Sequence, residues 1–525
     1  MALVSQAALA ATPQAVDVIV VGGTPGGIAA AVAAARSGAT VLLVEEQAHV
    51  GGVIAGGLSN IDNGNPAVIG GLFNEFKRRI VEHYARTYGS ESPQVRACRG
   101  GTDFEPRVAE QVFNDMLAGE KGITVKLRHR LRGVQRKGGK VKQVVLEDLT
   151  RPGTEMVNEG GVVVDATYEG DLAALAGVPY RVGRESRGEY GEPFAGRIYM
   201  DLGTKQVLTG STGEADCGIQ AFCFRFPLTQ VPENRVPVEK PAGYDRGDYG
   251  FLLADVKEGK IKTLRDAIQL RPAPNGKYIT NNDHTHPGKG CPRQSLDLSE
   301  ENWDWPEAGP EARARIFQRY WAYNDGVLWF LQNDPEVPEP LREVMSAWGF
   351  CKDEFPDHHH RPWQIYVREG RRIWGEANFT TRDTEPDPAT GKPRPRPDAI
   401  AIVEYGFDSH AVRTYDPAHP GVREGYVLAK HPPTQLPYGV VVPQKVDGLL
   451  VPLACSASRL AYQTVRMEPV FMALGEACGI AATIALDAKV EVRAVNVSDV
   501  QREIVKRGGV ICYDAPPNAP KSLKP

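Results

Sequence analysis

The stretch at residues 20–46 reads VVGGTPGGIAAAVAAARSGATVLLVEE and passes from an apolar run through a glycine cluster into an alanine-rich segment. A second apolar run follows and ends in two glutamates. Such apolar runs are typical of buried parallel strands, and Gly22 supplies the backbone freedom that a tight turn needs. Pro25 suits the first turn of a helix, where its missing N–H costs nothing. Residues 17–45 therefore predict a strand, a helix and a second strand.

The start of the predicted helix can bind a diphosphate, because its free backbone amides and its dipole attract anions. Glu45 ends the second strand 23 residues after Gly22, the spacing of an acid that accepts hydrogen bonds from a ribose 2′-OH. Its charge also disfavours the 2′-phosphate of NADP. Thr24 replaces the second glycine of the G-x-G-x-x-G pattern. The stretch predicts a dinucleotide site, and a plain turn that binds no ligand is the alternative.

The composition is that of an ordinary globular protein. Hydrophobic residues make up 42% and charged residues 24% of the 525 residues, and the formal net charge is −4. Because the sequence has no basic block and no run of eighteen apolar residues, we expect a small-molecule substrate and neither a nucleic-acid partner nor a membrane span. The eight cysteines include no CxxC pair and no zinc spacing, so we expect no dithiol chemistry. A disulfide between Cys217 and Cys223 stays open.

The pattern along the chain predicts a nucleotide-binding frame that is built from both ends and holds a long inserted region. We expect a disordered leader at 1–16, the first part of the frame at 17–180, an inserted substrate or cap domain at 181–435, the second part of the frame at 436–490 and a C-terminal extension at 491–525. Apolar spacing predicts helices at 72–88, 107–118, 311–333 and 469–487, with strands near 123–134, 141–147 and 162–167. The letters ALAA in the leader resemble a signal-peptidase site, so export is the alternative to the cytoplasmic location that we expect.

Blocks spread over the chain resemble the FAD-dependent oxidoreductases of the glutathione-reductase-like superfamily, in the branch with GGTPAG-type turns. Besides the opening stretch, they include HVGGVIAGGLSNIDNGN, FEPRVAEQVFNDML, VVVDATYEGDLAALAGVPYRVGRES, VREGRRIWGE, DSH and the C-terminal block that begins GLLVPLACSASRLAYQTVRMEPVFMALGEACG. The resemblance implies an α/β fold, in which a three-layer (β/β/α) Rossmann-like FAD-binding domain carries an inserted mixed α+β substrate or cap domain.

The resemblance also implies noncovalently bound FAD, with Gly51 and Gly52 passing along the flavin and Ala166 and Thr167 bordering it. The full set of expected cofactor-binding residues is Gly22, Gly23, Thr24, Pro25, Gly26, Gly27, Glu45, Glu46, Gly51, Gly52, Val134, Ala166, Thr167, Arg466, Glu468, Pro469 and Val470. Tyr168 replaces the glycine of the usual ATG turn. His49 precedes the glycine pair, and a covalent histidyl–flavin bond there is the minor alternative.

Residues 466–470 are expected to stabilise the reduced flavin, which carries negative charge. Pro469 can open a helix with Glu468 near its cap, and a helix N-terminus supplies about half a unit of positive charge. Arg466 can add a full charge. An ordinary core helix beside a surface arginine is the alternative.

A flavin supplies its own electron chemistry, so the protein needs a base, an orienting group and a pocket. His410, in EYGFDSHAVR, is the candidate base that takes a proton from an alcohol or amine as hydride leaves. Asp408 can orient it. A histidine that only packs or caps is the alternative.

Arg368 and Arg372, in the basic segment VREGRRIWGE, are the candidate ligands of an acidic substrate group, because arginine binds carboxylates through two parallel donors. A solvated basic face, or pairing with Glu369 and Glu376, is the alternative.

No metal site is expected, since no matching carboxylate spacing accompanies the two histidine clusters, His284 with His286 and residues 358–360.

We therefore expect a soluble FAD-dependent oxidoreductase that transfers hydride from a small polar substrate, an alcohol, sugar or amine, to flavin N5. The electron acceptor and the oligomeric state are left open. Two alternatives remain: a flavoprotein that uses FAD without net redox turnover, as an isomerase or hydratase does, and a binding protein without catalysis.

Overall fold

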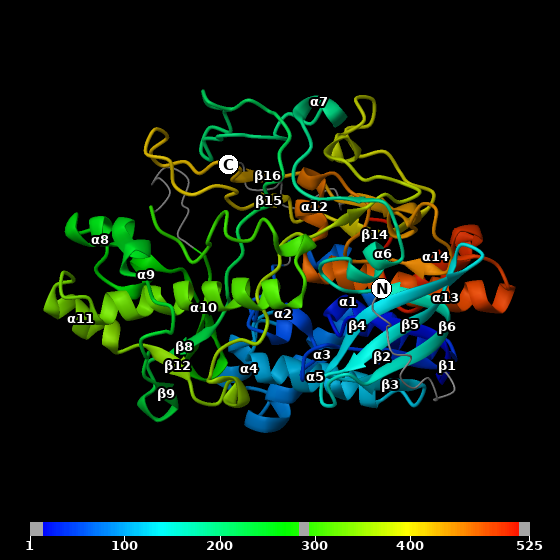
Figure 1. The fold of residues 1–525 in the computed structure, drawn as a ribbon, viewed down its shortest axis with the longest axis horizontal. Helices are drawn as coiled ribbons and strands as arrows, with labels where there is room; N and C mark the ends of the chain where they lie inside the picture. The colour runs from blue at the N-terminus through cyan, green and yellow to red at the C-terminus, as the bar shows by residue number, and fades with distance from the viewer. Residues whose placement is uncertain (1–13, 63, 283–292, 514–525) are drawn as a thin grey trace, which may run out of the picture.

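The computed structural model of the protein describes residues 14–62, 64–282 and 293–513 (Figure 1). Most of the leader predicted at 1–16 lies outside these residues. Its last three residues belong to the first strand, β1, which spans Gln14–Val21. The frame strand therefore begins three residues earlier than predicted.

The frame is built on one sheet with the order β3-β2-β1-β6-β5-β4, and β18 pairs with β6. Its strands are β2 (Val41–Val44), β3 (Ile123–Lys126), β4 (His129–Lys137), β5 (Lys140–Asp148), β6 (Glu155–Asp165) and β18 (Leu449–Leu450). Pairing is parallel between β3 and β2, β2 and β1, β1 and β6, and β6 and β18. On its other side β6 pairs antiparallel with β5, which pairs antiparallel with β4, so these three strands form a meander. The predicted α/β fold is confirmed, although the strand expected at 123–134 is divided into β3 and β4.

Alternate residues of β1 face two different layers, as a pleated strand requires. Val18 and Val20 pack in the core beneath the helices, whereas Ile19 and Val21 pack with Val144 and other residues of β5 on the opposite face. The meander thus covers the face of the parallel strands that the helices leave free. This arrangement gives the β/β/α layering.

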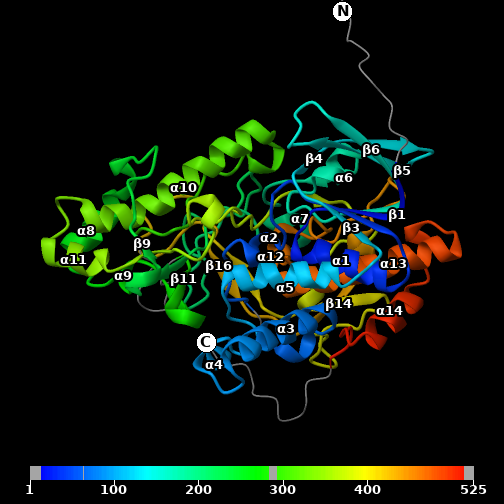
Figure 2. The ribbon, with the colours of Figure 1, turned by 90° about the horizontal axis from the view of Figure 1, so that it is seen from below.

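The helical layer joins the two ends of the chain. The helix α1 (Pro25–Arg36) packs against α13 (Glu468–Ala488), and Figure 2 shows both on the same side of the sheet with α3 and α5. A Cβ atom on Gly475 would lie 1.9 Å from the carbonyl oxygen of Gly26, and one on Gly479 would lie 2.2 Å from that of Ala30. Small residues on both helices therefore let their backbones touch.

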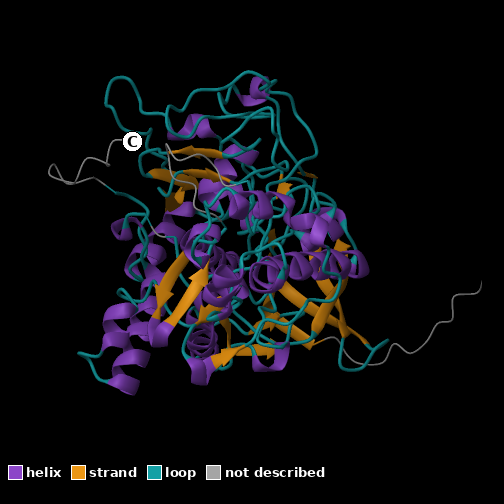
Figure 3. Cartoon of the chain, turned by 90° about the vertical axis from the view of Figure 1, so that its left-hand side faces the viewer, coloured by secondary structure: helices purple, strands orange, loops and turns teal. Residues whose placement is uncertain are grey.

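The inserted region carries a second, antiparallel sheet of order β10-β11-β8-β12-β9, with helices beside it (Figure 3). Its elements are β8 (Pro227–Thr229), β9 (Arg235–Val236), α8 (Gly250–Lys257), α9 (Leu264–Ala267), β10 (Leu270–Ala273), β11 (Lys277–Thr280), α10 (Pro310–Asn333), α11 (Glu339–Ser346) and β12 (Gly349–Cys351). The strand β14 (Ala399–Val403) also falls within residues 181–435 but is not part of this second sheet. It pairs with β17 (Thr434–Pro437) and packs on α13 and α14 (Val497–Lys506) near the C-terminus. The domain boundaries stay predictions.

The helices predicted within the frame are confirmed as α3 (Gly71–Tyr88), α5 (Pro106–Ala118) and α13. The glycine-rich stretch at 51–71 contains the buried helix α2 (Gly52–Ala55). The remaining elements are α4 (Pro93–Ala97), α6 (Asp171–Leu175), β7 (Tyr180–Arg181), α7 (Arg187–Tyr190), β13 (Arg372–Ile373), β15 (Phe407–Ser409), β16 (Val427–Ala429) and α12 (Arg459–Val465).

Within the described residues, α13 is the one helix long and apolar enough to cross a membrane, and 83% of its apolar window is buried inside the protein. It is a core helix by that measure. Cys217 and Cys223 are both free thiols, so the disulfide left open above does not form.

Candidate active site

The N-terminus of α1 opens on a cavity of about 600 Å³ between the frame and the inserted region. The ends of β1, β2 and β6 supply Gly22, Glu45 and Thr167 to its wall, and Arg313 comes from α10 on the opposite side. Gln47, Gly52, Tyr168 and Glu46 also line it. The cavity therefore lies where the sequence predicts the diphosphate.

The turn between β1 and α1 leaves no room for a side chain at its first glycine. Gly22 has a φ of +107°, and a Cβ atom there would lie 2.4 Å from the carbonyl oxygen of Ala166. Thr24, the departure from the glycine pattern, is the N-cap of α1. Its Oγ1 accepts a hydrogen bond from Gly27 N (3.1 Å) and donates one to Ala166 O (2.9 Å). Thr24 thus replaces glycine without blocking the turn.

The two glutamates at the end of β2 differ in their surroundings. Glu45 accepts hydrogen bonds from Gly23 N (2.6 Å) and Gln47 N (2.8 Å), and burial raises its pKa to about 7. Glu46 is exposed and pairs with Arg130 at 2.8 Å. Glu45 is therefore the acid held against the turn.

Val134 is not among the described residues that line this cavity, although Leu131 and Arg130 of the same strand are. Its side chain packs with β5 in the sheet. Its expected contact with the cofactor stays a prediction.

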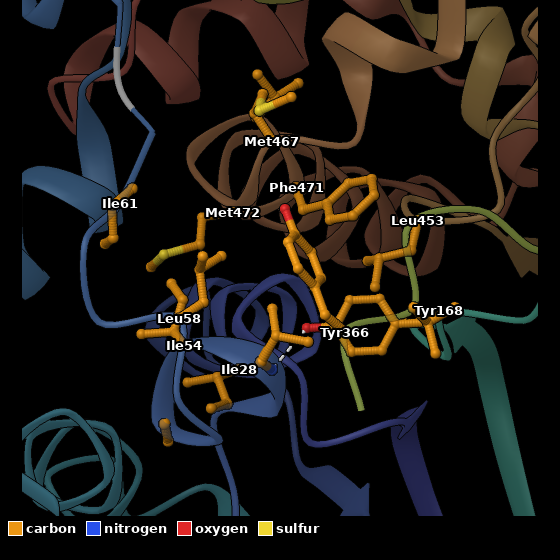
Figure 4. Packing of buried hydrophobic residues seen from close by; sticks show 14 of the residues in the cluster. Ile28, Ile54, Leu58, Ile61, Tyr168, Tyr366, Leu453, Met467, Phe471 and Met472 are labelled. Atoms are coloured by element: carbon orange, nitrogen blue, oxygen red, sulfur yellow. Dashed lines mark hydrogen bonds between the residues drawn. The ribbon is translucent and has the colours of Figure 1, made fainter. Parts of the chain in front are cut away.

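Tyr168, which replaces the expected glycine of the ATG turn, links three segments of the frame. Its hydroxyl donates to Glu468 Oε1 (3.0 Å) and accepts from Val53 N (3.1 Å), as Figure 4 shows for the second bond. A Cβ atom on Gly52 would lie 2.4 Å from that hydroxyl, so the glycine pair is needed for this contact. Tyr168 therefore joins the glycine pair to the start of α13.

Glu468 is the first residue of α13, one position before the predicted start at Pro469. It is 4% exposed, and no described residue forms a hydrogen bond with its Oε2. Burial raises its pKa to about 8, against the opposing effects of the Tyr168 hydroxyl and Arg466. The start of α13 thus carries a buried polar atom that awaits a partner.

His410 lies between two carboxylates. Its Nδ1 is 2.6 Å from Asp297 Oδ2, and its Nε2 is 3.6 Å from Asp408 Oδ2. The predicted orienting residue, Asp408, is thus the more distant one, and Asp297 from the inserted region makes the hydrogen bond. Burial alone would raise the pKa of both carboxyls. The nearby charge of Arg368 holds the pKa of Asp297 well below its usual range, and His410 lowers the pKa of both Asp297 and Asp408.

Arg466 connects this cluster to the predicted flavin-stabilising segment. It lies between α12 and α13 and is 3% exposed. Its guanidinium donates to the Asp408 carbonyl (2.6 Å) and carboxylate (3.1 Å) and to the Tyr366 hydroxyl (3.1 Å). His410, Asp408 and Arg466 therefore form one continuous network.

The three arginines of the basic segment are separated in the fold. Arg368 joins the cluster, with Nη2 2.9 Å from Asp297 Oδ1. Arg372 does not join it, because its guanidinium bonds Glu185, Gly183 O and Ala457 O. Arg371 pairs with Asp171 (2.7 Å) and Glu307 (2.8 Å). The structure thus brings Arg368 to His410, and a catalytic role of Arg372 stays a prediction.

The alternative partners considered for these arginines are occupied elsewhere, since Glu369 pairs with Arg459 and Glu376 with Arg493.

His49 does not stand free beside the glycine pair. Its ring nitrogens bond Glu110 (2.8 Å) and Asp357 (3.0 Å), and its ring stacks on Trp363. Both nitrogens therefore already have partners.

His284 and His286 lie outside the described residues. Of the groups that the structure does describe, Glu105, Asp353 and Glu354 alone have the spacing of metal ligands. The ammonium of Lys277 lies within 2.6–2.8 Å of all three carboxylates, where a cation would bind.

Comparison with protein-family models gives a match over residues 17–504 to the family described as FAD dependent oxidoreductase. The chain belongs to this family of FAD-dependent oxidoreductases. FAD is its cofactor, and oxidation–reduction is its reaction class. Comparison with curated proteins gives no match.

Several solved structures resemble parts of this oxidoreductase. They include L-proline dehydrogenase from P. horikoshii (17% identity, 37% of this chain and 25% of that chain, TM-score 0.19) and the glycerol-3-phosphate dehydrogenase from Bacillus halodurans complexed with FAD (15%, 35% and 42%, 0.22). The myxobacterial halogenase CndH matches at 17% identity over 44% of this chain and 46% of that chain, with a TM-score of 0.22. The match thus spans less than half the length of each of these three structures.

The residues present fit FAD. The cavity meets the N-terminus of α1, the turn at Gly22 forms a cradle that a Cβ atom would fill, and Glu468 Oε2 is an unpartnered polar atom at the predicted flavin segment. Sequence reasoning missed Asp297, Tyr366 and Tyr168 as members of the site. For Asp297 and Tyr366 no motif marks them, because they lie in the irregular part of the chain.

Proposed function

We propose that this oxidoreductase removes hydride from a carbon that bears a hydroxyl or amino group in a small polar substrate, with His410 as the general base. FAD, when bound, accepts that hydride at N5. The observation that carries the proposal is the position of His410, which is fixed by Asp297 and linked through Asp408 to Arg466 at the flavin segment.

The hydrogen bonds favour one tautomer of His410. Asp297 is ionised at neutral pH and can only accept, so the 2.6 Å contact requires a proton on Nδ1. Nε2 then carries the lone pair that can take a proton from the substrate hydroxyl or amine. The carboxylate of Asp408 lies near Nε2, with its Oδ2 3.6 Å away.

The imidazolium that forms would lie between two ionised carboxylates, Asp297 and Asp408. Arg368 and Arg466 in turn pair with these carboxylates. Such a preorganised arrangement stabilises charge where it develops, without a cost of reorganisation during the reaction. A positioned general base of this kind contributes about 10²–10⁴ to the rate.

The free cysteines support a cytoplasmic location, which we also propose. All seven cysteines among the described residues are free thiols, as expected in a reducing compartment. Fractionation of cells, with immunodetection of the protein in each compartment, tests this assignment. Detection in an exported fraction would overturn it.

The proposed reaction is tested by anaerobic mixing of the flavoprotein with a panel of alcohols, sugars and amines, while the flavin absorbance near 450 nm is followed. We expect at least one of these classes to bleach the flavin, and His410→Gln to slow the bleaching by about 10²–10⁴ with unchanged FAD content. A substrate that is isomerised or hydrated without bleaching would contradict the proposal. So would a His410→Gln variant that reacts at the wild-type rate.

A further inference from the structure

Arg225 is a buried arginine without a carboxylate partner. It is 6% exposed, and the one hydrogen bond described for its side chain runs from Nη1 to Thr280 O (3.3 Å). Among the described residues, its Nε has no hydrogen-bond partner and no acidic side chain forms an ion pair with it, although its charge acts on Asp297. A buried charge of this kind is unfavourable unless it is paired.

Arg225 is one of three guanidinium groups around the ring of Tyr366. Their central carbons lie 4.7 Å (Arg368), 5.5 Å (Arg225) and 5.9 Å (Arg466) from the ring centroid. One carboxylate pairs with each of the other two arginines, Asp297 with Arg368 and Asp408 with Arg466. The group therefore carries one positive charge more than its acidic partners neutralise.

Arg225 and Arg368 connect this group to the glycine-rich segment at 51–71 and to the candidate base. A Cβ atom on Gly57 would lie 1.8 Å from Arg225 O, so Arg225 packs directly against the glycine-rich segment that follows the glycine pair. On the other side, Arg368 shares Asp297 with His410. Figure 4 draws Tyr366 in the same buried cluster as Ile54 and Leu58 of this segment.

We propose that Arg225, with Arg368 and Arg466 around Tyr366, binds a carboxylate of the substrate. The guanidinium group matches a carboxylate with two parallel donors. One unneutralised positive charge matches a monoanion better than a phosphate monoester, which carries about −1.5 to −2. Since this inference rests on the proposed function, the substrate is a hydroxy acid or an amino acid, with the reacting hydroxyl or amine near Nε2 of His410.

The test measures binding apart from turnover. The probes are acetate, glycolate and glycine, added to the purified flavoprotein, and the readout is the change in the flavin absorbance spectrum, from which a Kd is obtained. We expect at least one probe to bind the wild type, and Arg225→Gln to weaken its binding at least tenfold. Arg225→Lys, which keeps the charge but loses the two parallel donors, should weaken the binding less than Arg225→Gln does. Arg132→Gln, at an exposed arginine on β4, is the matched control and should bind as the wild type does.

Two further measurements keep the outcomes distinct. If Arg225→Gln loses its flavin, Arg225→Lys is used in its place. Its binding of glycolate and glycine is compared with its binding of ethanol and ethylamine, which carry a methyl group instead of the carboxylate. Equal binding of the compounds with and without a carboxylate overturns the proposal. The reduction potential of the flavin is measured in each variant. A lowered potential with unchanged carboxylate binding would assign the charge to the reduced flavin and overturn the proposal, as would failure of all three probes to bind the wild type.

The proposed function fails separately from this inference. His410→Gln should still bind the carboxylate probe while it no longer passes hydride to the flavin. If no alcohol or amine bleaches the flavin, hydride transfer is contradicted, yet the Kd of the probe and its dependence on Arg225 can still be measured.

Discussion

His410 and Asp297 are 113 residues apart in the chain, yet their side chains meet at 2.6 Å between Nδ1 and Oδ2. The contact joins the residue that follows β15 to an earlier loop, and both lie within the region predicted as inserted, 181–435. It holds the ring by its Nδ1 side, whereas Nε2 lies 3.6 Å from Asp408 Oδ2. The residue that orients the candidate base is thus supplied by a distant part of the chain and not by its neighbour Asp408.

Replacing Asp297 by Asn should impair the reaction through the position of His410. An amide can present its NH₂ to the ring and allow the other tautomer, so we expect flavin reduction to slow by about 10²-fold or more, with a changed pH profile. Rapid anaerobic mixing over pH 6–9 measures both. Asp304→Asn, at an exposed aspartate, is the control. A wild-type rate and pH profile in Asp297→Asn would refute the positioning role.

Glu45→Gln should weaken FAD binding. Loss of a charged hydrogen-bond acceptor at the ribose costs about 1.5–3 kcal/mol, which corresponds to a Kd raised roughly 10- to 150-fold. Titration of the apoprotein with FAD, followed by flavin fluorescence, gives the Kd. Glu46→Gln is the control, because Glu46 is exposed and paired with Arg130. An equal or larger effect of Glu46→Gln would show that the wrong acid has been assigned.

Gly22→Ala should prevent both stable folding and FAD binding. The added Cβ atom would meet Ala166 O at 2.4 Å in a backbone conformation that disfavours a side chain. Gly38→Ala separates the strain of the backbone conformation from the clash of the added atom. Gly38 has a similar φ of +93°, but a Cβ atom there would have nothing within 4 Å. We expect Gly38→Ala to cost about 1–2 kcal/mol of stability and to keep its flavin, whereas Gly22→Ala should be colourless after purification. A yellow Gly22→Ala protein would contradict the tight turn.

Glu468→Gln should change how stability depends on pH. The pKa of Glu468 is raised from 4.5 to about 8 in the folded protein, so its contribution is fully present below pH 4.5 and is lost as pH rises through about 8. We therefore expect the Tm of the wild type, measured against that of Glu468→Gln, to fall between pH 5 and pH 9. Thermal unfolding of both flavoproteins across this range gives the difference.

Glu82→Gln serves as the control for Glu468→Gln, because Glu82 is an exposed helix residue paired with Arg78. A difference in Tm between the wild type and Glu468→Gln that stays constant with pH would mean that Glu468 is already ionised in the folded protein.

The sequence predicted the frame because its signals are local. Strand, turn, helix and acid follow one another between residues 17 and 45, and each depends on neighbours within a few positions. The role of Thr24 was not predictable, since its second bond goes to Ala166, 142 residues away. The same holds for Tyr168, whose partner Glu468 is 300 residues away.

The candidate site was predicted in part for the same reason. His410, Arg368 and Arg466 stand in recognisable blocks and do meet in one network. Arg372 is only four residues from Arg368, yet it turns to Glu185, because β13 pairs with β7 there. Closeness in sequence thus did not give closeness in space. Arg225 stands in no recognisable block, so the sequence alone did not single it out.

The backbone contact between α1 and α13 has a consequence for biosynthesis. During translation, α1 leaves the ribosome more than four hundred residues before the helix that must cover it, so its small residues face solvent or temporary partners until then. Large proteins expose apolar surface in such incomplete states and depend on chaperones. Cofactor uptake by the nascent polypeptide should therefore wait until residue 488 has emerged, and ribosome-stalled chains that end before α13 should be isolated without FAD.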